Sequence, residues 1–179
     1  SYLANPLVNA LCVGVMKKDE IKLAKAEGPG SKVVLFGSRT GGDGIGGASE
    51  LASAELGDAD GAKRPTVQIG DPFEESKLLE CSLELLDQGL LVALQDLGAA
   101  GLTSSSSEMA AKGGVGIDLD VRRVPLREAD MEPFEIMISE SQERMLCVVE
   151  PARLDAVLGV CAKWEVNATA IGEVTGSGR

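Results

Sequence analysis

Hydrophobic residues gather in short runs along the chain, and each run has the length expected of a buried β-strand. A continuous apolar run predicts a strand that is buried on both faces, and strict alternation predicts a half-buried one. One segment, residues 115–121, alternates Val, Ile and Leu with Gly and Asp. The continuous runs that we predict as strands cover residues 7–16, 33–36, 90–95, 145–149 and 169–174.

Apolar residues at spacings of three and four predict helices between these strands. The clearest helix follows Asp71, which has the residue type of an N-cap. Pro72 fits the first helical position, Glu74 completes a D-x-x-E capping box, and Gly89 fits the end of the helix. A second helix is predicted to open with residues 98–101 and to run to about residue 112, and further helices are predicted over residues 133–138 and 151–164. Because strands come in succession first and alternate irregularly with helices afterwards, the order favours an α+β fold or a mixed α/β sheet covered by helices.

Composition narrows the chemistry that this chain can perform alone. The 179 residues include no histidine, which excludes an imidazole general base, a Ser-His-Asp or Cys-His arrangement and histidine-ligated zinc. Acidic residues outnumber basic ones by 28 to 17, and the net charge of −11 argues against nucleic-acid or anionic-membrane binding.

Further features of the sequence indicate a cytosolic protein. The cysteines Cys12, Cys81, Cys147 and Cys161 lie in apolar runs without C-x-x-C spacing, so we interpret them as reduced core residues. No apolar run approaches the ~20 residues of a membrane span, and we expect no secretory signal because a basic n-region and a cleavage site are missing. The chain begins at Ser1 without a Met, and we expect it to be a processed or excised segment that forms one domain over residues 1–179.

Four polar segments beside the predicted elements are candidate sites. The glycine-rich residues 41–47 could approach a phosphate, but the pattern favours a purely conformational role. Gln68 lies between two apolar residues and is either a ligand contact or a water-facing edge residue. Asp96 ends a predicted strand and is either a Mg²⁺ ligand or an N-cap. The pattern of residues 138–145, taken alone, favours a surface turn.

Seven segments in a fixed order together resemble the phosphoribosylformylglycinamidine synthase family, over residues 2–176. The segments V-Q-I-G-D-P-F, Q-D-L-G-A-A-G and I-S-E-S-Q-E-R-M are jointly specific, whereas the glycine loop also occurs in aminoimidazole ribonucleotide synthases. The seven segments are N-P-L-V-N-A (5–10), T-G-G-D-G-I-G-G (40–47), V-Q-I-G-D-P-F (67–73), Q-D-L-G-A-A-G (95–101), S-E-M-A-A-K-G-G (107–114), V-P-L-R-E (124–128) and I-S-E-S-Q-E-R-M (138–145).

The resemblance implies a three-layer α/β/α domain with a mixed sheet, similar to the C-terminal domain of aminoimidazole ribonucleotide synthase. It implies that this chain is the first C-terminal-type domain of a four-domain cytoplasmic ligase of purine biosynthesis. Such enzymes convert formylglycinamide ribonucleotide to the amidine with ATP, Mg²⁺ and ammonia from glutamine. The implied partners are a glutaminase subunit, a small accessory subunit and the remaining domains of the enzyme, and ATP is bound mainly by those domains. The resemblance implies neither nucleic acid nor a membrane as a partner. We expect the fragment alone to be inactive.

The resemblance also assigns roles to single residues. It implies that Gln68, Glu140, Ser141 and Gln142 contact the substrate and that Asp96 binds Mg²⁺. It places no catalytic residue in this chain, because the family's catalytic histidine lies in segments absent here, and we interpret Arg144 as a structural or rim residue. Two alternatives are a different ATP-dependent enzyme of the aminoimidazole ribonucleotide synthase type and a non-catalytic assembly half.

Overall fold

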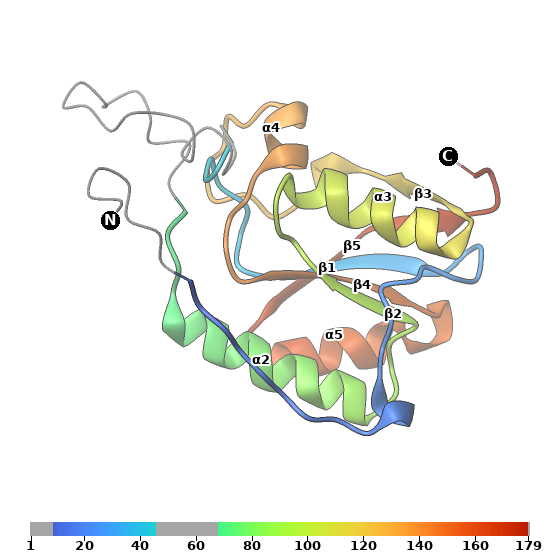
Figure 1. The fold of residues 1–179 in the computed structure, drawn as a ribbon. Coiled ribbons are helices and arrows are strands. Elements are labelled where there is room, and N and C mark those ends of the chain that lie inside the picture. Colours follow the sequence, from blue (N-terminus) through green and yellow to red (C-terminus); the bar gives the residue numbers. More distant parts are fainter. Residues whose placement is uncertain (1–8, 46–67, 179) are drawn as a thin grey trace.

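A five-stranded sheet forms the centre of the molecule in the computed structural model, which describes residues 9–45 and 68–178 (Figure 1). The strand order is β2-β4-β1-β5-β3, and every pairing between these strands is antiparallel. The strands are β1 (Lys32–Gly37), β2 (Ala93–Asp96), β3 (Gly116–Leu119), β4 (Arg144–Val149) and β5 (Asn167–Thr175).

Helices cover both faces of this sheet, as Figure 1 shows. Helices α2 (Pro72–Asp87) and α5 (Leu154–Lys163) lie on one face, and α3 (Gly101–Gly113) and α4 (Pro133–Ile138) lie on the other. Short 3-10 turns complete the described elements: η1 (Lys18–Glu20), η3 (Val121–Arg123) and η4 (Pro151–Arg153). The predicted α+β class and its three layers are therefore confirmed.

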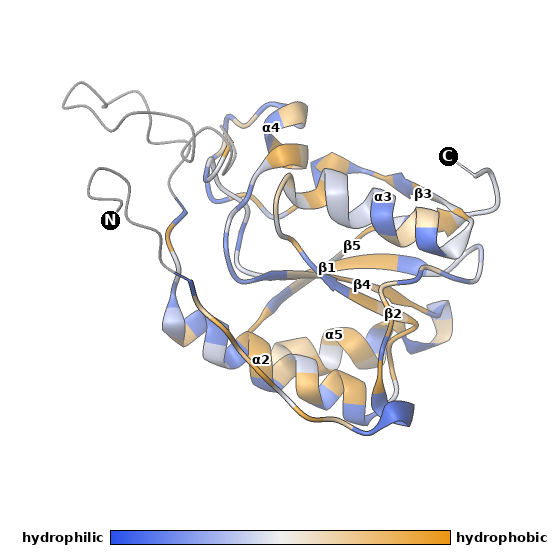
Figure 2. Cartoon of the chain, in the orientation of Figure 1, coloured by the Kyte–Doolittle hydropathy of each residue, from blue (hydrophilic) through white to orange (hydrophobic). Residues whose placement is uncertain are grey.

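Two apolar cores separate the layers, because successive side chains of a strand point to opposite faces. In β1, Val33 and Leu35 pack in the core beneath α3 and α4, whereas Val34 and Phe36 pack in the core beneath α2 and α5. Figure 2 shows the central strands as strongly hydrophobic. Burial on both faces explains why β1 and β4 were recognisable as continuous apolar runs.

Helix α2 begins where the sequence predicts. The Asp71 carboxylate accepts hydrogen bonds from Phe73 N at 3.0 Å and Glu74 N at 3.2 Å, as an N-cap does. Glu74 pairs with Lys77 at 2.6 Å, in place of the expected reciprocal capping-box contact. After the C-cap Gln88, Gly89 adopts a φ of 63°, the left-handed conformation that ends many helices.

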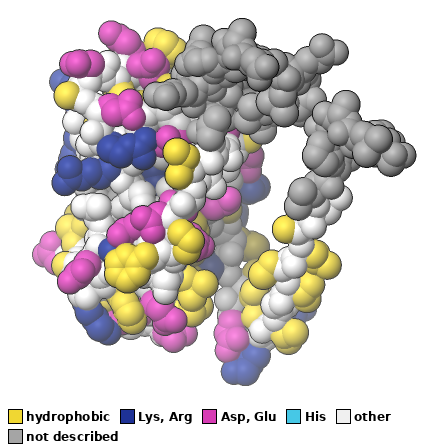
Figure 3. Space-filling model, turned by 90° about the vertical axis from the view of Figure 1, so that its left-hand side faces the viewer, with side chains coloured by type: hydrophobic (Ala, Val, Ile, Leu, Met, Phe, Trp, Pro, Cys, Tyr) yellow, Lys and Arg dark blue, Asp and Glu magenta, His cyan; other side chains and the backbone are white. Residues whose placement is uncertain are grey.

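Three further predictions about the fold are wrong. Residues 9–16 of the predicted strand 7–16 form an exposed arm, and Figure 3 shows hydrophobic side chains along it. Cys12 lies on this arm and is exposed, whereas the other three cysteines are buried. The sheet is antiparallel throughout rather than mixed, and the parallel contact between Thr40 and Leu126 is an isolated bridge.

The arm differs from the prediction because an apolar pattern says nothing about what covers a segment. Strand β1 already pairs with β4 on one side and β5 on the other, and no described strand pairs with residues 9–16. Residues 7 and 8 lie outside the described residues. Within the described part of the chain, no helix is long and apolar enough to cross a membrane.

Candidate functional site

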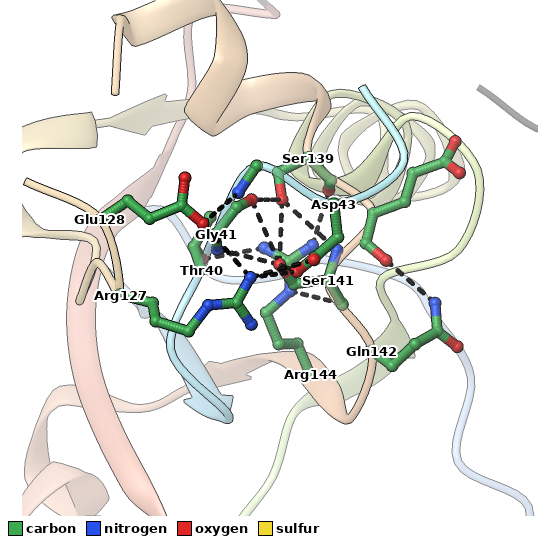
Figure 4. A network of polar contacts seen from close by, with 11 residues as sticks. Thr40, Gly41, Asp43, Arg127, Glu128, Ser139, Ser141, Gln142 and Arg144 are labelled. Carbon is green, nitrogen blue, oxygen red and sulfur yellow. Dashed lines mark hydrogen bonds and ion pairs between the residues drawn. The ribbon is translucent and has the colours of Figure 1, made fainter. Parts of the chain in front are cut away.

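The buried guanidinium of Arg144 holds together the turn that joins α4 to β4. It donates hydrogen bonds to Ser139 O at 2.6 Å, to Ser141 O at 2.7 Å and to Thr40 Oγ1 at 2.9 Å (Figure 4). Burial lowers the pKa of Arg144 to about 10, so the side chain stays charged at neutral pH. Arg144 is therefore structural, and the alternative of a rim residue is wrong.

Two serines fasten this turn to the glycine-rich loop. Ser139 Oγ donates to Gly41 O at 2.6 Å, and Ser141 Oγ accepts from Gly41 N at 2.9 Å. Ser141 Oγ also contacts Asp43 Oδ2 at 2.5 Å. Ser139, Glu140 and Ser141 are all buried, so the surface turn that the pattern favoured is wrong.

The glycine loop approaches other residues closely, and at Gly44 the backbone conformation itself favours a glycine. A Cβ at Gly41 would lie 2.1 Å from an Arg127 nitrogen. Gly44 has a φ of +67°, and a Cβ there would lie 2.5 Å from the Cβ of Glu140. These contacts support the predicted conformational role, while Gly46 and Gly47 lie outside the described residues.

Glu140 connects two segments that are far apart in the sequence. Its side chain is buried, and its two oxygens accept from different partners: Ala100 N at 2.9 Å and Gln68 Nε2 at 2.5 Å. Ala100 has a φ of 59°, an uncommon conformation for a residue with a side chain, and it is the N-cap of α3. Glu140 thus joins the residue before α3 to the segment before α2.

Two cavities flank the turn, and Gln142 lines both. One cavity of about 370 Å³ lies against α2 and is also lined by Asp96, Glu143 and Arg144. The other, of about 390 Å³, is also lined by Arg39 and Ser141. Gln142 Nε2 donates to Glu140 O at 2.9 Å, which fixes the side chain between the two cavities.

Asp96 is the last residue of β2, and its side chain is exposed. It does not cap α3, because the N-cap of that helix is Ala100 and no side chain caps it; the N-cap alternative is wrong. Among the described residues no group of three or more metal-binding side chains occurs. A single carboxylate still fits Mg²⁺, which commonly binds one or two carboxylates together with waters and substrate phosphates.

The structure brings together four of the five predicted site residues in one network. Gln68 and Gln142 both donate to Glu140, and Ser141 is joined to Glu140 through Asp43. Asp96 lines the same cavity as Gln142. Sequence reasoning missed Thr40, Ala100 and Asp43, which position this network. The G-D-G and G-A-A-G patterns were the signal for Asp43 and Ala100, because glycines mark places where backbone segments approach closely.

Glu143 was also missed, and it links the turn to the start of α2. Its Oε1 accepts from Asp71 N at 2.9 Å, and its φ is 54°. Burial raises the pKa of the Glu143 carboxyl, and the nearby carboxylates of Glu75, Asp71 and Glu74 raise it further. On the other side of the turn, Arg127 pairs with Asp43 at 2.8 Å, and this contact raises the pKa of Arg127.

A comparison with protein families matches residues 28–179 to the family described as AIR synthase related protein, C-terminal domain. The chain belongs to this family. Among named proteins, it is 57% identical over 180 residues to phosphoribosylformylglycinamidine synthase subunit PurL of Nocardioides sp.. The match covers 100% of this chain and 24% of that protein, so the chain spans about a quarter of the length of the relatives it matches.

Solved structures agree with this assignment. The structure described as T. maritima PurL complexed with FGAR is 46% identical, with a TM-score of 0.79, over 88% of this chain and 26% of that one. The structure described as T. maritima PurL complexed with ATP is 41% identical, with a TM-score of 0.75, over 90% of this chain and 24% of that one.

Proposed function

We propose that this chain is one domain of an ATP-dependent ligase that converts formylglycinamide ribonucleotide to formylglycinamidine ribonucleotide in purine biosynthesis. The similarity to PurL proteins over the whole chain supports this proposal, as do the FGAR and ATP complexes of the T. maritima relative. Because the chain spans a quarter of such proteins, it supplies part of a site that the remaining domains complete.

The contact between Gln68 and Glu140 is the observation that carries the proposal. These residues are 72 positions apart, and their contact brings the V-Q-I-G-D-P-F and I-S-E-S-Q-E-R-M segments together. Gln68, Glu140, Ser141 and Gln142 form the chain's part of the substrate site. Amide and carboxylate groups can hold ribose hydroxyls and the formamide without transferring a proton themselves.

Asp96 is the residue of this chain that would hold Mg²⁺. When bound with ATP, the ion supplies positive charge against phosphate oxygens. The chain's net charge of −11 would repel a phosphorylated substrate and ATP, so the remaining domains supply compensating positive charge. We place the enzyme in the cytoplasm with a glutaminase subunit and a small accessory subunit as partners, and with neither nucleic acid nor membrane.

The test is ATP-dependent amidine formation from formylglycinamide ribonucleotide and ammonia. The complete enzyme should turn over, and the 179-residue chain alone should not. Turnover by the chain alone would contradict the division of the site between domains. A complete enzyme that uses formylglycinamidine ribonucleotide but not formylglycinamide ribonucleotide would favour the alternative of an aminoimidazole ribonucleotide synthase-type enzyme.

A further inference from the structure

The hydrogen bond between Gln68 and Glu140 has a direction, and the direction determines what Gln68 offers to a ligand. An ionised carboxylate accepts hydrogen bonds and cannot donate them, whereas a glutamine amide has one accepting and one donating end. Glu140 Oε2 accepts from the Gln68 Nε2 amide at 2.5 Å. One N–H of the amide is therefore engaged within the protein, and this contact fixes the orientation of the amide, whose carbonyl oxygen points away from Glu140 Oε2.

Glu140 is itself held in place from its other side. Its Oε1 accepts from Ala100 N at 2.9 Å, and its backbone N donates to Asp43 O at 2.8 Å. The residue is 3% exposed, so its side chain has little freedom to turn away from Gln68. Gln68 is exposed, and none of the described residues donates a hydrogen bond to its Oε1.

We infer that Glu140 is a positioning residue that turns the carbonyl oxygen of Gln68 toward the ligand. The group that binds this carbonyl oxygen must then carry an N–H or O–H donor, as amides and ribose hydroxyls do. The inference rests on the proposed function, because it concerns the same ribonucleotide site. It refines the role of Glu140, whose two oxygens are both occupied within the protein.

Glu140→Gln reverses this polarity in the complete enzyme while changing few atoms. Ala100 N still requires an acceptor, so the new side chain turns its oxygen there and its NH₂ toward Gln68. Gln68 must then present its carbonyl oxygen to position 140 and its NH₂ to the ligand. The NH₂ of Gln68 and the donor group of the ligand would then face each other without an acceptor between them. We expect the KM and the equilibrium Kd for formylglycinamide ribonucleotide to rise about tenfold or more, with the KM for ATP unchanged.

The double variant Gln68→Glu with Glu140→Gln restores the original polarity and the original net charge. The amide introduced at position 140 then donates to the carboxylate introduced at position 68, whose second oxygen faces the ligand as an acceptor. This variant should recover most of the lost affinity, which a merely structural role of Glu140 does not predict. The matched control is Glu108→Gln, which makes the same substitution in a second carboxylate–glutamine contact. Glu108 accepts from Gln95 Nε2 at 3.0 Å, and this variant should leave the KM unchanged.

The inference is overturned if Glu140→Gln binds the ribonucleotide as tightly as the parent, or if the double variant binds no better than the single one. Where Glu140→Gln fails to fold, the double variant alone decides: near-parental affinity supports the inference and lost affinity overturns it. Binding is measured without ATP, separately from turnover. A parent enzyme that binds the ribonucleotide but forms no amidine refutes the proposed function alone, and one that does not bind refutes both.

Discussion

Arg144 is a buried cation whose three hydrogen-bond partners are two carbonyl oxygens and a hydroxyl rather than a carboxylate. The arrangement costs desolvation energy, which the lowered pKa of the guanidinium reflects. In return, one side chain fixes the backbone on both sides of Glu140. At this scale the site is a set of hydrogen bonds whose directions are determined by a few buried polar groups.

Replacing Arg144 should therefore destabilise the domain. Arg144→Met leaves Ser139 O, Ser141 O and the Thr40 hydroxyl without their donor, and we expect a loss of about 2 kcal/mol or more in the free energy of unfolding. Urea unfolding measures it. Arg144→Lys keeps the charge but cannot reach all three acceptors, so its loss should be smaller. An unchanged urea midpoint for the Met variant would contradict this role.

Glu143 should affect stability in a pH-dependent way. Its carboxyl pKa is raised above the ordinary value of 4.5, so the folded protein holds the proton more tightly than the unfolded chain does. Ionised Glu143 therefore destabilises the fold above its folded pKa, and this cost disappears as the pH falls below the ordinary value.

Glu143→Gln keeps an acceptor for Asp71 N but removes the charge. We expect this variant to be more stable than the parent at about pH 7 and equal to it near pH 4, which is measured as the difference in urea midpoints across that range. A stability difference that does not depend on pH would show that the effect comes from packing rather than from the charge.

At the scale of elements, features that depend on residues close together in the sequence were predicted correctly, and the order of the strands was not. The start of α2 was predicted from Asp71 and Pro72 because capping depends on residues within one turn. Helix α4 has the predicted bounds, and β1 and β4 were found because both of their faces are buried. The antiparallel order of the sheet could not be predicted, because strand order depends on contacts between segments far apart in the sequence.

Glycines in two elements provide a matched pair of tests. Gly44→Ala places a Cβ at a φ of +67° and 2.5 Å from Glu140 Cβ, so we expect a loss of about 2 kcal/mol or more in unfolding free energy. Gly159 lies within α5, and a Cβ there would meet nothing within 4 Å beyond its own stretch of the helix, so we expect Gly159→Ala to gain up to about 1 kcal/mol. Urea denaturation should give these opposite signs, and a neutral Gly44→Ala would contradict the close docking of the glycine loop.

At the scale of the whole molecule, the site depends on contacts that no local pattern contains. The resemblance named Gln68 and Glu140 separately, but their contact spans 72 residues and became visible only with the fold. The burial of Arg144 was equally hidden, because it follows from the way the glycine loop covers the turn. In the proposed function, the side chains of this chain hold and orient groups, a role that requires no histidine.

The packing of the whole molecule can be tested with its thiols. Cys12 is exposed, whereas Cys81, Cys147 and Cys161 are buried, and burial raises the pKa of the Cys147 thiol. We expect one thiol to react rapidly with Ellman's reagent at neutral pH and three to react only in denaturant. Two or more rapid thiols in the folded chain would contradict the packing of α2 and α5 against the sheet.

The exposed arm has a practical consequence for handling the domain in solution. Leu11, Val13 and Val15 are 89%, 78% and 100% exposed, and they occupy alternate positions of a segment without regular secondary structure. Such a segment can pair with the same segment of another molecule and seed aggregation. Concentrated preparations of the domain should therefore self-associate through the arm, and charged substitutions there should improve solubility without altering either core.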